Sequence, residues 1–146
     1  MKKFNFQYEN ILEFKKKNEE DAQNKLSNEL TMLEEEKMKL MSLQNNMNGT
    51  YGKLNELMTE GIDVSILKMY DLFIANLNGR IKRQSNTIQN HSDKANQLRQ
   101  ELLKVSKELK IFEKLKEHHQ NEYDYYIKKE EEKLMDQLVT YKSFIK

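Results

Sequence analysis

The sequence contains no cysteine, no proline and no tryptophan, and only four of its 146 residues are glycine. Without cysteine the chain can form no disulfide, no thiolate metal site and no cysteine nucleophile, which excludes thiol redox chemistry and fits a reducing compartment. The absence of proline, together with the abundance of Glu, Lys, Leu, Met, Gln and Asn, is typical of long helices and coiled coils rather than of sheets.

A long hydrophobic run is missing as well. No stretch approaches the roughly 20 consecutive apolar residues of a membrane-spanning helix. Asn5, Gln7 and Glu9 interrupt the apolar segment that a signal peptide would need after Lys3. The formal net charge is only +1, whereas binding to nucleic-acid phosphates requires a net basic surface. We therefore expect a soluble, cytoplasmic protein that binds no nucleic acid and reaches a membrane only through a partner.

Charged residues are abundant instead, making up 34% of the chain, while apolar residues make up 37%. A chain this polar does not build a large globular core, which leaves disorder or paired helices as the alternatives. The regular spacing of the apolar residues favours paired helices, because a disordered sequence would not keep such a phase.

The second half of the chain carries an unbroken heptad pattern with alternating steps of four and three residues. It runs through Tyr70, Ile74, Leu77, Ile81, Gln84, Ile88, His91, Ala95, Leu98, Leu102, Val105, Leu109 and Phe112. The phase then shifts, and the pattern continues through Leu115, His119, Tyr123, Leu134, Leu138, Tyr141 and Ile145. Such a shift is expected to alter the supercoil locally. We interpret His91 as a polar seam residue that determines register.

The first half repeats the pattern with more polar interruptions. Its predicted seam is Leu26, Leu30, Leu33, Lys37, Leu40, Gln44, Met47, Tyr51, Leu54 and Met58, preceded by Phe4, Tyr8, Leu12 and Ala22. Between the halves, Gly61 suits the left-handed residue that ends a helix, and Asp63 suits the N-cap of the next. Ile62 and Leu67 fall at the two positions of a hydrophobic staple.

The sequence therefore predicts an all-α fold: one long antiparallel two-helix coiled coil, or helical hairpin, as a single domain over residues 1–146. The helices are expected at about 5–60 and 64–142, joined by a turn at about 61–63. The second helix is longer, so that residues 121–146 project past the first. Charge favours this pairing, because the stretch 80–116 has ten basic and four acidic residues and the facing stretch 8–44 has nine acidic and six basic.

No catalytic or cofactor site stands out, and we expect a protein that is not an enzyme and binds no cofactor. Gly49 and Gly52 lack the strand and the Lys-Ser or Lys-Thr pair of a phosphate-binding loop, and are interpreted as a weak point in the first helix. His118 and Glu122 lie one helical turn apart, but two ligands make no metal site, and His119 occupies a seam position.

Two groups of apolar residues exceed what a two-helix seam can bury. Near the turn these are Ile66, Leu67, Met69, Leu72 and Phe73, with a stripe through Phe73, Leu77, Arg80 and Gln84 and with Met47 and Tyr51 across the hairpin. A thicker local core and a partner-binding tip explain this group equally well. At the opposite end they are Phe4, Phe6, Tyr8, Ile11, Leu12, Tyr123, Tyr126, Leu134, Leu138, Tyr141, Phe144 and Ile145, which we expect a partner to cover.

The order of motifs along nearly the whole chain resembles the FliJ family of flagellar type III export proteins. The resemblance is carried by the aromatic opening with Ile11-Leu12, by the Gly61-Ile62-Asp63 turn, and by two later stretches. These stretches are Tyr70-x-x-Phe73-Ile74-x-x-Leu77-x-x-x-Ile81 and Phe112-Glu113-Lys114-Leu115-Lys116-Glu117 with Glu122-Tyr123. The resemblance implies a hairpin similar to the coiled coil of the rotary-ATPase gamma subunit.

The resemblance further implies three kinds of partner: the hexameric export ATPase FliI, the export gate FlhA and the export chaperones. It places gate binding at the hairpin tip, on Phe73 and Leu77 and on Met47 and Tyr51, with Asn46 replacing Met47 if the alignment slips by one. Arg80 and Gln84 occupy positions where the family can carry other residues. The opposite end, with Phe4, Tyr8, Ile11, Tyr123, Tyr126, Leu134, Leu138 and Tyr141, would enter the ATPase ring.

A protein of this kind would serve flagellum biogenesis, motility and chemotaxis from the cytoplasm, held peripherally at the membrane by the gate. The alternatives are the stalk protein of a virulence type III secretion system and a generic coiled-coil adaptor. A coiled-coil arm of a nucleic-acid protein is disfavoured because it would need a basic face.

Overall fold

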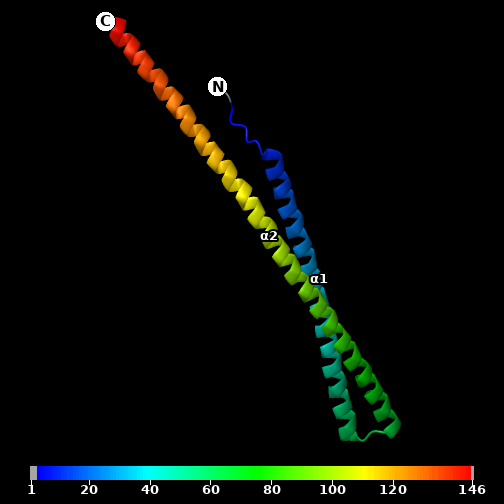
Figure 1. Cartoon of the computed structure of the whole chain (residues 1–146). Coiled ribbons are helices and arrows are strands. Elements are labelled where there is room, and N and C mark those ends of the chain that lie inside the picture. Colours follow the sequence, from blue (N-terminus) through cyan, green and yellow to red (C-terminus); the bar gives the residue numbers. More distant parts are fainter. Residues whose placement is uncertain (1–2, 146) are drawn as a thin grey trace. The chain divides into compact units, whose positions relative to one another are not determined.

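The computed structural model describes residues 3–145, so residues 1, 2 and 146 of the predicted domain lie outside the described residues. It contains two long helices, α1 (Glu9–Glu60, 52 residues) and α2 (Val64–Ile145, 82 residues), and no strand within the described range. The helices pack against each other in antiparallel directions (Figure 1). The predicted helical hairpin is therefore confirmed. Neither described helix is long and apolar enough to cross a membrane.

The chain divides into two compact units. We call Ala22–Glu101 the turn unit, and we call the residues up to Asp21 together with those from Leu102 onwards the terminal unit. The prediction of a single domain stays a prediction. Each unit has its own core, and each is described separately below.

A three-residue turn, residues 61–63, joins the helices. Gly61 has φ of 97°, the left-handed conformation that ends a helix and that residues with a Cβ rarely adopt. Asp63 precedes the first residue of α2, and its carbonyl accepts the first helical hydrogen bond, from the Leu67 backbone N–H at 3.0 Å. Ile62 and Leu67 both pack on the core of the turn unit, as expected for a hydrophobic staple.

Helix α1 begins at Glu9, later than the start near residue 5 that the sequence predicted. Residues 3–6 have no regular secondary structure. Phe4 and Phe6 are two residues apart, which places both side chains on the same side of an extended segment. Both rings lie against α2, and Phe6 is only 4% exposed. Packing of these aromatic rings against α2 therefore takes the place of the first predicted helical turn.

The seam predicted for α2 is confirmed from Tyr70 to Tyr123, whereas its predicted continuation through Leu134, Leu138, Tyr141 and Ile145 is wrong, because these residues are exposed. Each of its members from Tyr70 to Phe112 is buried or partly buried, and so are Leu115, His119 and Tyr123 after the phase shift. The heptad pattern is regular here because apolar residues occupy nearly all of its positions.

The register predicted for α1 is wrong at alternate positions. Leu26, Leu33, Leu40, Met47 and Leu54 are buried or partly buried as predicted. In contrast, the predicted members Lys37, Gln44, Tyr51 and Met58 are exposed, and the residue before each is partly buried instead: Glu36, Leu43, Thr50 and Leu57. Glu29 is likewise more deeply buried than Leu30. At two of these positions the seam residue is a glutamate, where the heptad rule expects an apolar residue, and at the other three it is Leu43, Thr50 or Leu57.

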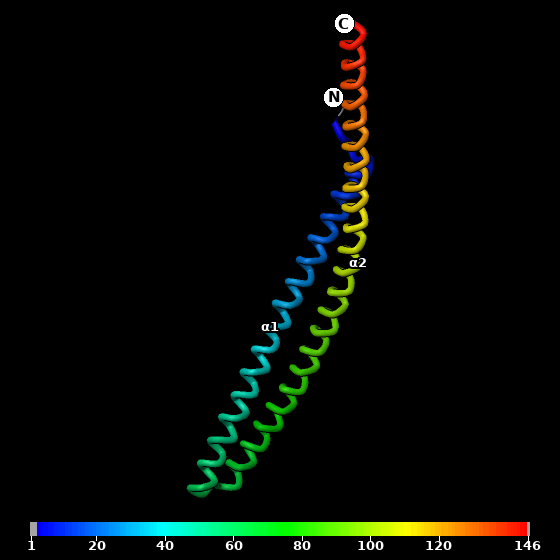
Figure 2. The backbone as a smooth tube through the Cα atoms, turned by 90° about the vertical axis from the view of Figure 1, so that its left-hand side faces the viewer, coloured from blue at the N-terminus to red at the C-terminus, as the bar shows by residue number. Residues whose placement is uncertain are grey.

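Each unit has a small apolar core. In the turn unit, where α1 and α2 lie side by side (Figure 2), the buried cluster consists of Met47, Leu54, Ile74 and Leu77. In the terminal unit it consists of Phe6, Leu12 and Leu109, with Phe4, Tyr8, Phe112 and Leu115 packed around it. Two ion pairs also join the helices of the terminal unit, Lys15 to Glu108 at 3.0 Å and Lys116 to Glu9 at 2.9 Å. Partly exposed pairs of this kind contribute at most about 1 kcal/mol each.

Candidate partner-binding surfaces

The residues predicted to bind a partner near the turn separate into core and surface. Leu77 is 1% exposed and Met47 is 8% exposed, and both belong to the core of the turn unit. Phe73 and Tyr51 are 51% and 45% exposed, and Arg80 is exposed as well. Leu77 and Met47 therefore support this surface from below, while the other three are accessible to a partner.

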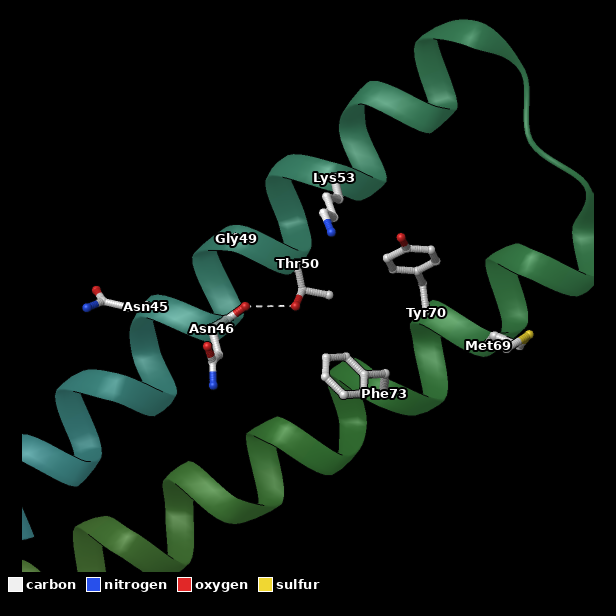
Figure 3. A pocket seen from close by; sticks show the side chains of 8 residues that line it. All are labelled: Asn45, Asn46, Gly49, Thr50, Lys53, Met69, Tyr70 and Phe73. Atoms are coloured by element: carbon white, nitrogen blue, oxygen red, sulfur yellow. Dashed lines mark hydrogen bonds between the residues drawn. The ribbon is translucent and has the colours of Figure 1, made fainter.

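A groove of about 770 Å³ lies between the two helices beside Phe73. Its lining residues are Asn45, Asn46, Gly49, Thr50, Lys53, Met69, Tyr70 and Phe73. Figure 3 shows Tyr70 and Phe73 pointing from α2 towards α1, and the Thr50 hydroxyl donating a hydrogen bond to the Asn46 carbonyl at 2.7 Å. The wall formed by α2 is aromatic and apolar, and the wall formed by α1 is polar.

Most of this groove was not among the predicted binding residues. Asn46 entered only as an alternative to Met47, and Met69 only as surplus apolar surface. The members from α1 are two adjacent pairs, 45–46 and 49–50, followed by Lys53, so that they recur every three or four residues and share a helix face; Met69 and Phe73 are likewise four residues apart. That spacing was visible in the sequence, but their position across from Phe73 depended on the register of α1.

A second hollow of about 420 Å³ adjoins the groove and shares Asn46 with it. It is lined by Lys39, Ser42, Leu43, Asn46, Arg80, Arg83, Gln84 and Thr87. Here Gln84 turns inwards, donating from Nε2 to the backbone carbonyl and to the carboxylate of Glu36 at 2.9 and 2.5 Å. Gln84 therefore joins the helices, while Arg80 remains available on the surface.

Two polar layers cross the seam of the turn unit, seven residues apart on each helix. In the first layer, Glu36 accepts hydrogen bonds from Gln84. In the second layer, the Glu29 carboxylate accepts a hydrogen bond from His91 Nδ1 at 2.5 Å and lies 3.6 Å from Lys94 Nζ. Glu29 is only 3% exposed. The hydrogen bond from His91 holds the pKa of the Glu29 carboxyl below its ordinary value of 4.5, with Lys94 acting in the same direction and burial opposing both. Within the described chain, no deeply buried polar side-chain atom lacks a hydrogen-bond partner.

In the terminal unit, the predicted aromatic residues of the N-terminal segment meet α2. The ring of Phe4 lies 5.6 Å from that of Tyr123, centroid to centroid, and Phe6 packs edge-on against His119 at 5.6 Å. Tyr8 is partly buried beside them, while Ile11 is 41% exposed. Phe4 and Tyr8 thus stabilise this end of the fold, and Ile11 is available to a partner.

Beyond these contacts α2 continues without cover from α1. All residues from 131 to 145 are exposed. The predicted docking residues Tyr126, Leu134, Leu138 and Tyr141 are 60%, 59%, 52% and 65% exposed. The predicted projection began at residue 121, but contact extends to Tyr123 because an extended segment covers about twice the length per residue that a helix does. Further exposed apolar residues in this stretch are Met135, Val139, Phe144 and Ile145.

The remaining candidates lie on the two helices. His118 and Glu122 form a surface pair, with Nε2 and Oε1 3.0 Å apart. Among residues 3–145, no three His, Cys, Asp or Glu side chains gather in a way that could hold a metal ion. Gly49 and Gly52 both lie within the continuous helix α1.

Comparison with protein-family models gives a match to the family described as "Flagellar FliJ protein", over residues 4–145. Neither the curated proteins nor the solved structures contain a match. The matched range includes both units and both candidate surfaces.

Proposed function

This chain belongs to the flagellar FliJ protein family, and from this premise we propose that it couples the export ATPase FliI to the export gate FlhA and escorts export chaperones. Membership makes the chain a component of the flagellar export apparatus, in a family whose role in protein transport is non-catalytic. Our proposal goes beyond family membership in two respects: the coupling of the ATPase to the gate, and the identity of the individual partners.

The observation that carries the proposal is that α2 presents two separate apolar surfaces. One, in the turn unit, includes the exposed ring of Phe73, and the other is the uncovered stripe through Tyr126, Leu134, Leu138 and Tyr141. Exposed apolar surface of this extent marks protein-interaction sites, and aromatic residues supply much of the binding energy at such sites. One uninterrupted helix of 82 residues carries both.

We assign the gate to the turn unit and the ATPase hexamer to the terminal unit. At the gate, Phe73, Tyr51 and Arg80 make the contacts, and Leu77 and Met47 hold them in place from the core. At the ATPase ring, the exposed stripe of α2 and Ile11 pack against apolar surface while charged residues stay hydrated. The protein is then cytoplasmic and held peripherally at the flagellar base by the gate.

In this proposal, any effect of the protein on ATP hydrolysis comes from binding and not from a catalytic group of its own. A partner that binds one state of a ring more tightly than another shifts the ring towards that state. Stimulation of hydrolysis therefore requires unequal affinity for the states of FliI.

Deleting residues 131–146 tests the assignment of the ATPase end. The described part of this segment is exposed, so the shortened chain should keep its helicity and unfolding midpoint. Binding to purified FliI, measured by pull-down and calorimetry, should be weakened, whereas binding to FlhA should be retained. Phe73→Ala is the converse control, and should weaken FlhA binding only.

Undiminished FliI binding by the shortened chain would contradict the docking role of this stripe. Binding to the ATPase of a virulence secretion system, with none to FliI, would favour the alternative stalk protein instead.

A further inference from the structure

Gly49 is a glycine that its own chain does not require. It lies in α1, and among the described residues the only glycine with a positive φ is Gly61. A Cβ built at Gly49 would meet no atom within 4 Å. Glycine is the poorest helix former after proline, so this residue weakens α1. Neither the backbone conformation nor packing within the chain offers a compensating reason.

The open space beside Gly49 is the groove of the turn unit. Gly49 lines it together with Phe73 and Tyr70, whose rings come from the facing helix (Figure 3). The missing side chain exposes the backbone of α1 next to Phe73, which is 51% exposed. A glycine beside an exposed aromatic ring allows another molecule to approach the backbone closely.

The charge around the groove has one sign. Lys53 lines the groove, and Lys39, Arg80 and Arg83 line the adjoining hollow. No residue lining either hollow is acidic. Lys39 bonds to Glu36 at 3.1 Å, yet its side chain remains 64% exposed. The groove and the adjoining hollow together therefore complement a segment that carries an apolar side chain next to acidic residues.

We propose that Gly49 is the point of closest approach for an acidic segment of the gate protein, which places one large apolar side chain over Gly49 against Phe73 and directs carboxylates towards Arg80 and Arg83. This inference rests on the proposed function and adds the chemistry of the partner and a residue that determines specificity. The apolar contact supplies affinity, and the arginines supply orientation and association rate.

Gly52 provides a matched control. A Cβ there also meets no atom within 4 Å, but Gly52 lines neither hollow. Alanine at either position should therefore raise the unfolding midpoint of the chain in urea. The two variants should differ only in binding: with purified gate protein, Gly49→Ala should raise Kd about tenfold and Gly49→Leu more, since the added side chain occupies the space of the partner. Gly52→Ala and Gly52→Leu should bind as the unchanged chain does.

Salt dependence tests the acidic character of the partner. Raising the salt concentration from about 0.1 M to about 1 M shortens the screening length from about 10 to about 3 Å, and should weaken gate binding of the unchanged chain severalfold. The double variant Arg80→Gln, Arg83→Gln should bind more weakly at low salt and lose most of this dependence. If the double variant shows the same salt dependence as the unchanged chain, the proposal that the bound segment is acidic is overturned.

Failure of this inference is distinguishable from failure of the proposed function. If Phe73→Ala weakens gate binding while Gly49→Leu does not, the gate assignment holds and the role of Gly49 is overturned. Equal weakening by the Gly49 and Gly52 variants would also overturn it, since stiffening of α1 would then be the cause. If the unchanged chain does not bind the purified gate protein, the gate assignment itself fails, and the proposed occupant with it.

Discussion

In the turn unit α2 packs against a second helix. In the terminal unit it meets first a helix and then an extended aromatic segment, and its residues 131–145 are exposed. The same continuous helix is therefore covered by different structures in the two units. The difference shows how few residues are needed to cover a helix. Residues 3–6 extend the contact as far as Tyr123 because extended backbone advances about 3.3 Å per residue and helix only 1.5 Å.

The units also differ in what lies in the seam. The core of the turn unit near residues 61–63 is apolar, and further along its helices two glutamates replace apolar residues. The terminal unit instead concentrates aromatic rings around Leu12 and Leu109. Apolar packing provides most of the stability in both units, while the polar layers specify which residues face each other.

The largest effect is expected from Leu77→Ala in the turn unit. Leu77 is 1% exposed, and truncating a buried leucine costs about 3 kcal/mol. Phe73→Ala, one helical turn away at an exposed position, should cost less than about 1 kcal/mol. Urea unfolding followed by circular dichroism measures both. Equal losses would mean that Phe73 belongs to the core, contrary to the separation described above.

A smaller and local effect is expected from Phe6→Ala in the terminal unit. The ring is 4% exposed and packs on His119, so its removal should release the extended segment at a cost of about 2 kcal/mol. Hydrogen exchange should become faster around Leu109 and His119 and stay unchanged in the turn unit, because local openings are independent of the global one. Faster exchange at Ile74 would indicate instead that the two units unfold together.

The smallest effect concerns the polar layers and depends on pH. The folded-state pKa of Glu29 lies below its ordinary value of 4.5 because His91 donates a hydrogen bond to it, and Gln84 lowers that of Glu36 in the same way. A depressed carboxyl pKa contributes stability that is complete above the ordinary value and is lost as the pH falls through the folded-state value. The thermal midpoint should therefore fall from about pH 5 downwards.

Glu29→Gln should flatten this decline, whereas Glu34→Gln, an exposed glutamate on the same helix, should leave it unchanged. Thermal unfolding between about pH 6 and pH 3 distinguishes them. An identical decline in all three proteins would show that other carboxyl groups control the acid sensitivity.

The sequence by itself determined the two helices, the turn and the face that α2 buries. The heptad pattern of α2 is nearly all apolar from Tyr70 to Phe112, so periodicity alone identifies the buried side. Gly61 and Asp63 are residue types with strong local preferences, which act without help from distant parts of the chain. The family resemblance rested on these same local patterns.

The tertiary structure alone decided the register of α1, the extended segment and the groove. Glu29 and Glu36 can lie in a seam only because His91 and Gln84 face them, and no rule of periodicity contains that pairing. Packing of Phe4 and Phe6 against α2 outweighed the helix predicted there. The groove beside Phe73 is lined by residues of both helices, Gly49 among them. Packing decides which residues face each other across two helices, since local propensity acts only along one chain segment.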